Sequence, residues 1–202
     1  MSAKLEIFFA TIEILVKKLL DWVEDLFRLK TGDEAKIYSQ VGQKHADRGN
    51  LDDAISSLKK ALELDPEDKE ASFKLARSCA KKGLLDDAIV YYRKALGSRR
   101  DAEIHYHLGL IYNRKKNTNF AINAFTKSIE LGPEMPDAYF RLALILDGQK
   151  NHKDAIGLYE KAIALNPDES KYYYSCGLAY DADNHHEKAI ECFRKAMETE
   201  EA

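Results

Sequence analysis

Histidine and cysteine are the side chains whose spacing in this chain could support catalysis or metal binding. His105 and His107 are two residues apart in a helical pattern, so their side chains point to different faces and cannot share a metal ion. His185 and His186 fall in a turn and are expected to be solvated. The sequence contains no Gly-rich phosphate loop, no G-x-S-x-G and no H-E-x-x-H. It therefore predicts a protein that is not an enzyme and that has no metal site and no cofactor.

The three cysteines, Cys79, Cys176 and Cys192, are far apart in the sequence and form no C-x-x-C pair. This usage indicates buried thiols in a reducing compartment rather than a disulfide framework or a zinc site. Acidic and basic residues nearly balance, 34 against 31, so no strong positive charge favours nucleic acid. We expect a cytoplasmic protein whose partners are proteins or peptides, not nucleic acid or a small-molecule substrate.

A pattern with a period of about 34 residues runs from Ala35 to the end of the chain. Each of its five copies places an alanine before an isoleucine, at Ala54, Ala88, Ala121, Ala155 and Ala189. A small residue precedes each of these alanines by twelve positions, at Gly42, Ala76, Gly109, Ala143 and Gly177. Apolar residues at i, i+3, i+4 and i+7 predict two helices in each copy. The small residues are expected where the two helices cross closely.

This pattern resembles the tetratricopeptide repeat (TPR) family, and the resemblance covers residues 35–202. It implies an all-α fold, a TPR superhelix (α-solenoid) of five helix-turn-helix repeats. The repeats are phased as 35–68, 69–101, 102–135, 136–169 and 170–202.

Three departures from the family pattern carry structural expectations. Lys116 and Lys150 stand where a turn glycine is usual. The second repeat lacks a closing proline and runs one residue short, so we expect a local irregularity at Gly97–Arg100. The last repeat has no additional capping helix. The charged residues of its second helix, such as Glu187 and Arg194, are expected to serve as a solvated cap.

The resemblance also implies a concave face lined by the first helix of each repeat. The fifth repeat positions supply aromatic rings in four successive repeats, and the ninth positions add a leucine in three of them. The predicted protein-binding groove comprises Phe73, Arg77, Tyr106, Leu110, Phe140, Leu144, Tyr174 and Leu178. An apolar stripe of this kind suits a partner helix laid along the groove. The alternative is that the rings pack only against neighbouring helices.

The carboxylate clamp of some TPR co-chaperones is not expected. Its positions here hold Ser39, Gln43, Lys74, Glu103 and His107. Glu103 has the wrong sign for binding an anion.

Residues 1–34 form a separate segment with a strongly apolar helical pattern. Apolar residues fill the a and d positions of about four heptads. They are Leu5, Phe8, Ile12, Leu15, Leu19, Trp22, Leu26 and Leu29. Glu6 and Glu13 interrupt the apolar run, so we expect neither a secretory signal nor a membrane-spanning helix.

Four roles for this amphipathic helix are open. It can dock in the groove of a second copy, which gives a self-assembling homo-oligomer. It can instead cap its own repeats, which leaves a monomeric peptide-binding adaptor. Helix-to-helix coiled-coil pairing is a third role. The fourth is a peripheral membrane anchor, although Lys17 and Lys18 are offset by Asp21 and Glu24, so anionic lipid would attract it weakly.

An apolar helix followed by five TPRs also resembles the magnetosome-associated TPR family of magnetotactic bacteria, the MamA type. The matching features are the N-terminal helix, the entry Ala35–Tyr38, the run Gly177–Tyr180 and the acidic tail Glu198–Ala202. The resemblance implies a bacterial, non-enzymatic scaffold that self-assembles through its N-terminal segment. Such a scaffold is peripheral on the cytoplasmic face of the magnetosome membrane and recruits other proteins through its TPR surfaces.

Overall fold

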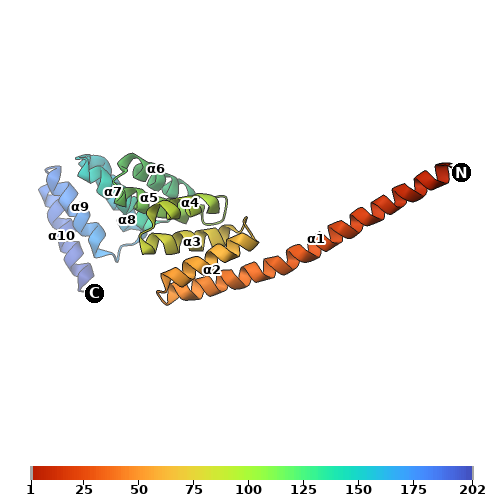
Figure 1. Cartoon of the computed structure of the whole chain (residues 1–202). Helices are drawn as coiled ribbons and strands as arrows, with labels where there is room; N and C mark the ends of the chain where they lie inside the picture. Colours follow the sequence, from red (N-terminus) through yellow and green to blue (C-terminus); the bar gives the residue numbers. More distant parts are fainter. Residues whose placement is uncertain (1, 202) are drawn as a thin grey trace. The chain divides into compact units, whose positions relative to one another are not determined.

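The computed structural model describes the backbone of residues 2–201 and all of their side chains except those of residues 2–14, 21, 24, 25 and 27–30. Within this range the chain forms ten α-helices joined by short turns (Figure 1). They are α1 (Ser2–Asp47), α2 (Leu51–Leu64), α3 (Lys69–Lys82), α4 (Leu85–Ala95), α5 (Asp101–Arg114), α6 (Thr118–Leu131), α7 (Pro136–Gly148), α8 (His152–Leu165), α9 (Ser170–Ala182) and α10 (His186–Glu200).

The helices divide into two compact units, Met1–Tyr91 and Tyr92–Ala202, with the boundary inside α4. In the first unit α1 packs against α2, and α2 packs against α3. In the second unit each helix from α5 to α10 packs against the next one along the chain. Consecutive helices thus form the packed pairs of a TPR α-solenoid, and the predicted all-α fold is confirmed.

The small residue in the first helix of a repeat faces a large residue in the second helix. A Cβ atom added to Gly109 would lie 2.6 Å from an atom of the Phe125 ring, and one added to Gly177 would lie 2.6 Å from Phe193. Gly42 approaches Leu58 in the same way. Real Cβ atoms do not come this close to other carbons, so glycine is what allows these helices to cross at this separation.

Alanine at position 109 is expected to destabilise the protein, while alanine at position 157 is expected to stabilise it. Gly109→Ala forces its Cβ against the fully buried ring of Phe125, and such overpacking costs about 1–3 kcal/mol. The better helix propensity of alanine returns about 1 kcal/mol. Gly157 in α8 has nothing within 4 Å of its Cβ direction, so Gly157→Ala gains about 0.5–1 kcal/mol.

The two urea-unfolding midpoints should therefore move in opposite directions relative to the parent protein. Both glycines lie in the second unit, so Gly157→Ala is a matched control. Equal midpoints for the two variants would contradict the close crossing at Gly109.

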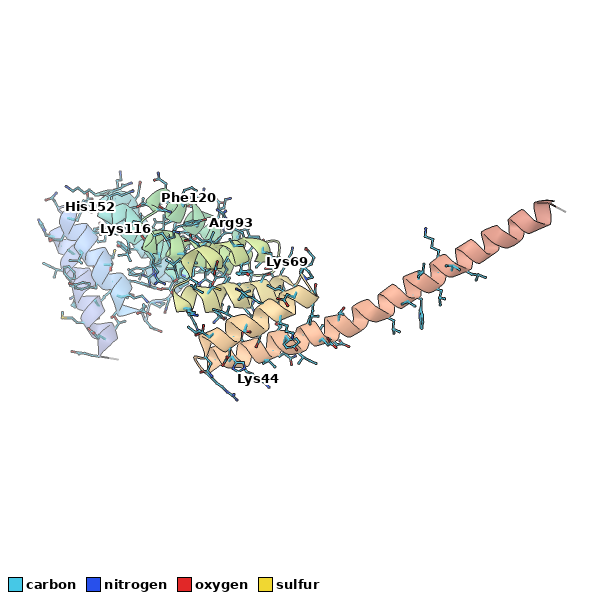
Figure 2. The ribbon with its side chains drawn as sticks, in the orientation of Figure 1. Lys44, Lys69, Arg93, Lys116, Phe120 and His152 are labelled. Carbon is cyan, nitrogen blue, oxygen red and sulfur yellow. The ribbon has the colours of Figure 1, made fainter. Side chains whose placement is uncertain are left out.

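The turn inside each repeat has the same hydrogen bond in all five copies. The residue after the turn donates its backbone N–H to the carbonyl five positions back in the Schellman pattern, as in Leu84 to Cys79 at 2.9 Å. This turn requires a left-handed residue. Gly49 and Gly83 supply it in the first two repeats, with φ of 82° and 89°. Lys116 (labelled in Figure 2) and Lys150 adopt the same backbone with φ of 59° and 65°, so they replace the glycine without changing the turn.

The irregularity expected at Gly97–Arg100 is present in the structure. α4 is a short helix that ends at Ala95, and Gly97 follows with φ of 80°. The Asp101 carboxylate then accepts hydrogen bonds from the backbone N–H groups of Gly97 and Ser98, at 3.1 and 2.9 Å. An acidic residue at the start of α5 therefore organises the loop that has no proline.

α1 crosses the expected boundary between residues 34 and 35 without a break. Its C-terminal part is the first helix of the first repeat, where Ala35, Ser39 and Gly42 are buried. Its N-terminal part extends past the end of α2 (Figure 1). The N-terminal segment and the first repeat thus share one helix of 46 residues. Over the residues that the structure describes, none of the helices combines the length and the apolarity that crossing a bilayer requires.

Candidate protein-binding surfaces

The N-terminal half of α1 exposes large apolar side chains to solvent. Leu15, Leu19, Trp22 and Leu26 each have more than half of their surface exposed, and Val16, Leu20 and Val23 beside them are exposed as well. The side chains of Leu5, Phe8, Ile12 and Leu29, predicted for the same seam, lie outside the described residues. A contiguous apolar face of this kind is typical of a surface that another protein or a membrane covers.

In the second unit, the first helices of three repeats present the predicted groove residues. Tyr174 and Leu178 on α9 are exposed, and Leu144 on α7 is also exposed. Tyr106 and Leu110 on α5 are partly buried. These side chains come from equivalent positions of α5, α7 and α9, so they form a repeated apolar surface suited to a helix or an extended peptide.

Two of the predicted rings are not available on this surface. Phe140 is 5% exposed because its ring packs against Tyr172 and Tyr159, with ring centroids 4.9 and 5.8 Å away. Phe73, in the first unit, is also buried, and the Arg77 guanidinium lies 5.8 Å from its ring centroid. The expectation that all four rings are exposed is corrected for these two. Their neighbours in the fold cover them.

A cavity of about 460 Å³ opens beside Tyr174, which is 56% exposed. The rings of Tyr174 and Phe193 pack against each other in its lining, with ring centroids 5.7 Å apart. Met197 and Ala196 of α10 complete its apolar lining, and Lys171 and Glu200 stand at its polar edge. The sequence analysis did not select Phe193 or Met197. The signal was available, because both stand at positions that are apolar in the other copies of the repeat.

The residues at the positions of the co-chaperone clamp make other interactions in this chain. Ser39 is buried, and the ammonium of Lys74 donates to its hydroxyl at 3.4 Å. In the second unit, Glu103 pairs with Arg100 at 3.0 Å and lies 3.6 Å from the His107 ring. The Glu103 carboxylate therefore lies at a position where the clamp requires a cation, as the sequence predicted.

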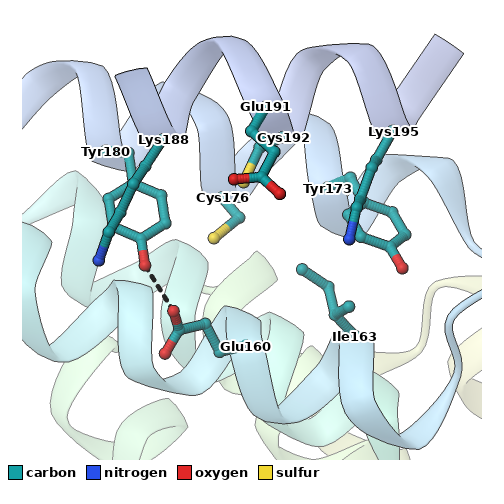
Figure 3. Close-up of a pocket in the computed structure, with 9 residues that line it drawn as sticks. All are labelled: Glu160, Ile163, Tyr173, Cys176, Tyr180, Lys188, Glu191, Cys192 and Lys195. Carbon is teal, nitrogen blue, oxygen red and sulfur yellow. Dashed lines mark hydrogen bonds between the residues drawn. The ribbon is translucent and has the colours of Figure 1, made fainter. Parts of the chain in front are cut away.

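The second unit also contains a pair of thiols. Figure 3 shows Cys176 on α9 and Cys192 on α10 in a pocket with Glu160. Burial raises the pKa of Cys176 and, to a lesser extent, the pKa of Cys192. In the first unit, burial and the nearby Asp87 carboxylate raise the pKa of Cys79 to about 11. Thiols with a raised pKa are protonated at neutral pH and are poor nucleophiles. Among the described side chains, no three His, Cys, Asp or Glu residues are grouped so that they could hold a metal ion.

Native Cys79 should react with a disulfide reagent roughly 100-fold more slowly than an ordinary thiol at pH 8. The reason is that its thiolate fraction falls by about that factor when the pKa rises by two units. Its rate should keep increasing with pH until about pH 11, where an ordinary thiol has already levelled off. The colour released by Ellman's reagent from the parent protein and from Cys79→Ser measures this. Urea should release all three thiols at once, and labelling of native Cys79 at the free-thiol rate would contradict the burial.

Sequence models of the tetratricopeptide repeat family match most of the chain. One model matches residues 42–103, a second matches 136–169, and a third matches both 102–134 and 170–202. The TPR repeat-containing protein MJ0940 of Methanocaldococcus jannaschii is 30% identical over 129 residues, which is 64% of this chain and 38% of MJ0940. This chain therefore spans less than half of that relative.

Solved structures of MamA are similar to this chain over most of its length. One MamA crystal structure has 35% identity and a TM-score of 0.76, and the match covers 84% of this chain and 93% of that one. MamA 41-end from Desulfovibrio magneticus RS-1 has 26% identity and a TM-score of 0.75, with 84% and 96% covered. YrrB, a TPR protein with an unusual peptide-binding site, has 22% identity and a TM-score of 0.68, with 80% and 84% covered. At that identity the likeness to YrrB concerns the fold alone.

Proposed function

We propose, from the premise that this chain belongs to the tetratricopeptide repeat family, that it is a magnetosome-associated scaffold that assembles with itself. Proteins of this fold are interaction modules and are generally not enzymes. The N-terminal helix would link copies, and the groove would hold partner proteins. The single observation that carries self-assembly is the exposed apolar face of α1.

The size of this face supports association between copies. Burying a Leu or Trp side chain contributes about 1.5–3 kcal/mol. Leu15, Leu19, Trp22 and Leu26 together would supply about 6–12 kcal/mol by that rule, similar to the 4–15 kcal/mol or so that association costs in lost freedom. The balance favours a concentration-dependent assembly rather than a permanent complex of two chains.

The groove of the second unit is the proposed acceptor. Leu144, Tyr174 and Leu178 expose apolar surface at the spacing of successive repeats, which suits a helix with apolar residues at regular intervals. Contact between a helix at one end and a groove elsewhere is heterologous, so it produces rings or filaments rather than closed pairs.

The magnetosome association rests on the similarity to MamA, at 35% identity over most of both chains. The polar face of α1 carries both signs of charge, with Lys17 and Lys18 near Asp21 and Glu24. Anionic lipid attracts such a face weakly. The protein would therefore reach the cytoplasmic side of the magnetosome membrane mainly through protein partners held in its groove.

Replacing Leu19 and Trp22 by glutamine should weaken the self-association of the protein. The double variant removes two large apolar contacts from α1, so the association constant should fall at least tenfold. Light scattering after gel filtration, over a range from micromolar to hundreds of micromolar, measures the mass. Lys17→Gln with Lys18→Gln is the matched control, because it changes the same turns of α1 without removing apolar surface and should leave the mass unchanged.

If the parent protein remains monomeric throughout this range, the self-assembly hypothesis is wrong and the monomeric adaptor is the remaining function. Co-sedimentation with phosphatidylglycerol vesicles distinguishes the membrane anchor from the scaffold and the adaptor. If the parent protein binds the vesicles and Leu19→Gln with Trp22→Gln does not, while the mass of the protein in solution is the same for both, the exposed face of α1 is assigned to lipid.

Tyr174→Ala with Leu178→Ala should weaken binding of the N-terminal helix to the groove at least tenfold. Both side chains are exposed, so the double variant removes contact surface while the fold is retained. The anisotropy of a labelled peptide of residues 2–34, titrated with the protein, measures the affinity. Val90→Ala, an equally exposed apolar side chain on α4, should bind as the parent does. Unchanged affinity for the double variant would exclude these residues as the acceptor.

A further inference from the structure

The two ends of the repeat array carry apolar residues at positions that inner repeats use for stacking. In a solenoid each repeat contacts only its neighbours, and the outer faces of terminal repeats are normally polar. The outer faces of α1 and α10 instead expose apolar residues. Each of these exposed residues has a buried or packed counterpart at the same position of another repeat.

The end of the array lies on α10, where Ile190 and Met197 are exposed. Ile190 is 67% exposed, whereas Ile156, its counterpart on α8, is 8% exposed. α9 packs against α8 and covers that position. Met197 is 60% exposed, and its counterpart Ile163 packs against the core. The charged side chains of α10, expected to form a solvated cap, therefore leave an apolar strip uncovered.

The front of the array lies on α1, where Ile37 and Val41 are exposed. Ile37 is 58% exposed, although its counterparts Ala71 and Tyr172 are buried. Val41 corresponds to Leu75 of the second repeat and Cys176 of the fifth, which are buried as well. In the inner repeats these are the residues of a first helix that face the preceding repeat: α3 packs on α2, and α9 packs on α8.

The cavity beside Tyr174 is the place where such a residue would enter. One repeat earlier, Phe140 occupies the position of Tyr174, and the Tyr172 ring from the next repeat covers it at 4.9 Å. Tyr174 is instead 56% exposed, and the cavity of about 460 Å³ lies beside it. Ile37 is the front residue that corresponds to Tyr172. A second copy that stacks in the manner of a next repeat would place Ile37 over Tyr174.

The polar side chains at the edge of the contact between two repeats also occupy equivalent positions from one repeat to the next. Tyr180 donates its hydroxyl to Glu160 between the fourth and fifth repeats, and Arg93 donates to the Tyr112 hydroxyl at 2.9 Å between the second and third. Arg194 on α10 stands at the repeat position of Glu160 and Arg93. His45 on α1 stands at the repeat position of Tyr180 and Tyr112. The outer edge of the same contact therefore also brings together one polar side chain from each copy.

We propose that the front of one copy, Ile37 and Val41 on α1, stacks on the end of a second copy, Ile190 and Met197 on α10. The stacking continues the packing that joins successive repeats within the chain. It goes beyond docking of the N-terminal helix: none of these four residues is assigned to that docking, although Tyr174 would be contacted in both. The contact is heterologous, so each added copy leaves one free front and one free end.

The test uses a full-length chain in which Leu19→Gln and Trp22→Gln have removed N-terminal docking. Into this background we would introduce an end variant, Ile190→Glu with Met197→Glu, and a front variant, Ile37→Glu with Val41→Glu. Val90→Glu is the matched control, since Val90 is as exposed as Ile190 but lies on no stacking face. Sedimentation velocity over a range of concentrations measures the species present.

The background chain and Val90→Glu are expected to self-associate as concentration rises. The end variant and the front variant should each be monomeric alone, with association at least tenfold weaker. A mixture of the two should form a one-to-one complex and nothing larger, because each variant keeps the face that the other has lost. Ile190→Gln with Met197→Gln should behave as the glutamate variant does, and circular dichroism should report unchanged helicity for each chain.

A background chain that stays monomeric at every concentration would overturn the stacking and leave N-terminal docking untouched. End and front variants that associate as strongly as Val90→Glu would overturn it too, as would a mixture that forms no complex. If the background chain associates as strongly as the parent, N-terminal docking fails while the stacking stands.

Discussion

The fold depends on the close crossing of two helices within each repeat. Gly109 and Gly177 have no side chain to separate their helices from the rings of Phe125 and Phe193, so the rings lie directly against the backbone of the first helix. The separation of the pair determines where every other side chain of the repeat lies. The same crossing aligns the first helices, and Leu110, Leu144 and Leu178 then come from equivalent positions of neighbouring repeats.

Because stability in such an array comes from each repeat and its neighbours, its two ends are chemically different from its interior. Phe140 and Tyr174 occupy the same repeat position, and each ring packs on the aromatic residue of its own second helix. Phe140 is covered in addition by Tyr172, whereas Tyr174 is exposed and opens onto a cavity. Equal positions of the repeat thus differ in burial: one ring belongs to the core and the other is exposed.

Two kinds of apolar surface can therefore link copies of this chain. The N-terminal half of α1 extends an amphipathic face beyond the first repeat, and α10 leaves an apolar strip after the last one. Because α1 is one continuous helix, its exposed face is connected directly to the front of the array. A scaffold with both contacts would add copies at its ends and hold partners along the groove. This arrangement agrees with the similarity to MamA.

The sequence by itself determined the repeat, its period, its helix pairs and the positions of small residues, since these follow from local spacing and residue size. It also predicted the irregular loop before Asp101, because a missing proline and a missing residue are local features. Only the tertiary structure decided which groove residues are exposed, since the burial of Phe73 and Phe140 depends on side chains far away in the sequence. It likewise revealed that Ile37, Val41, Ile190 and Met197 are uncovered, because exposure depends on what the neighbouring element contributes, and a period of 34 residues gives every copy the same pattern.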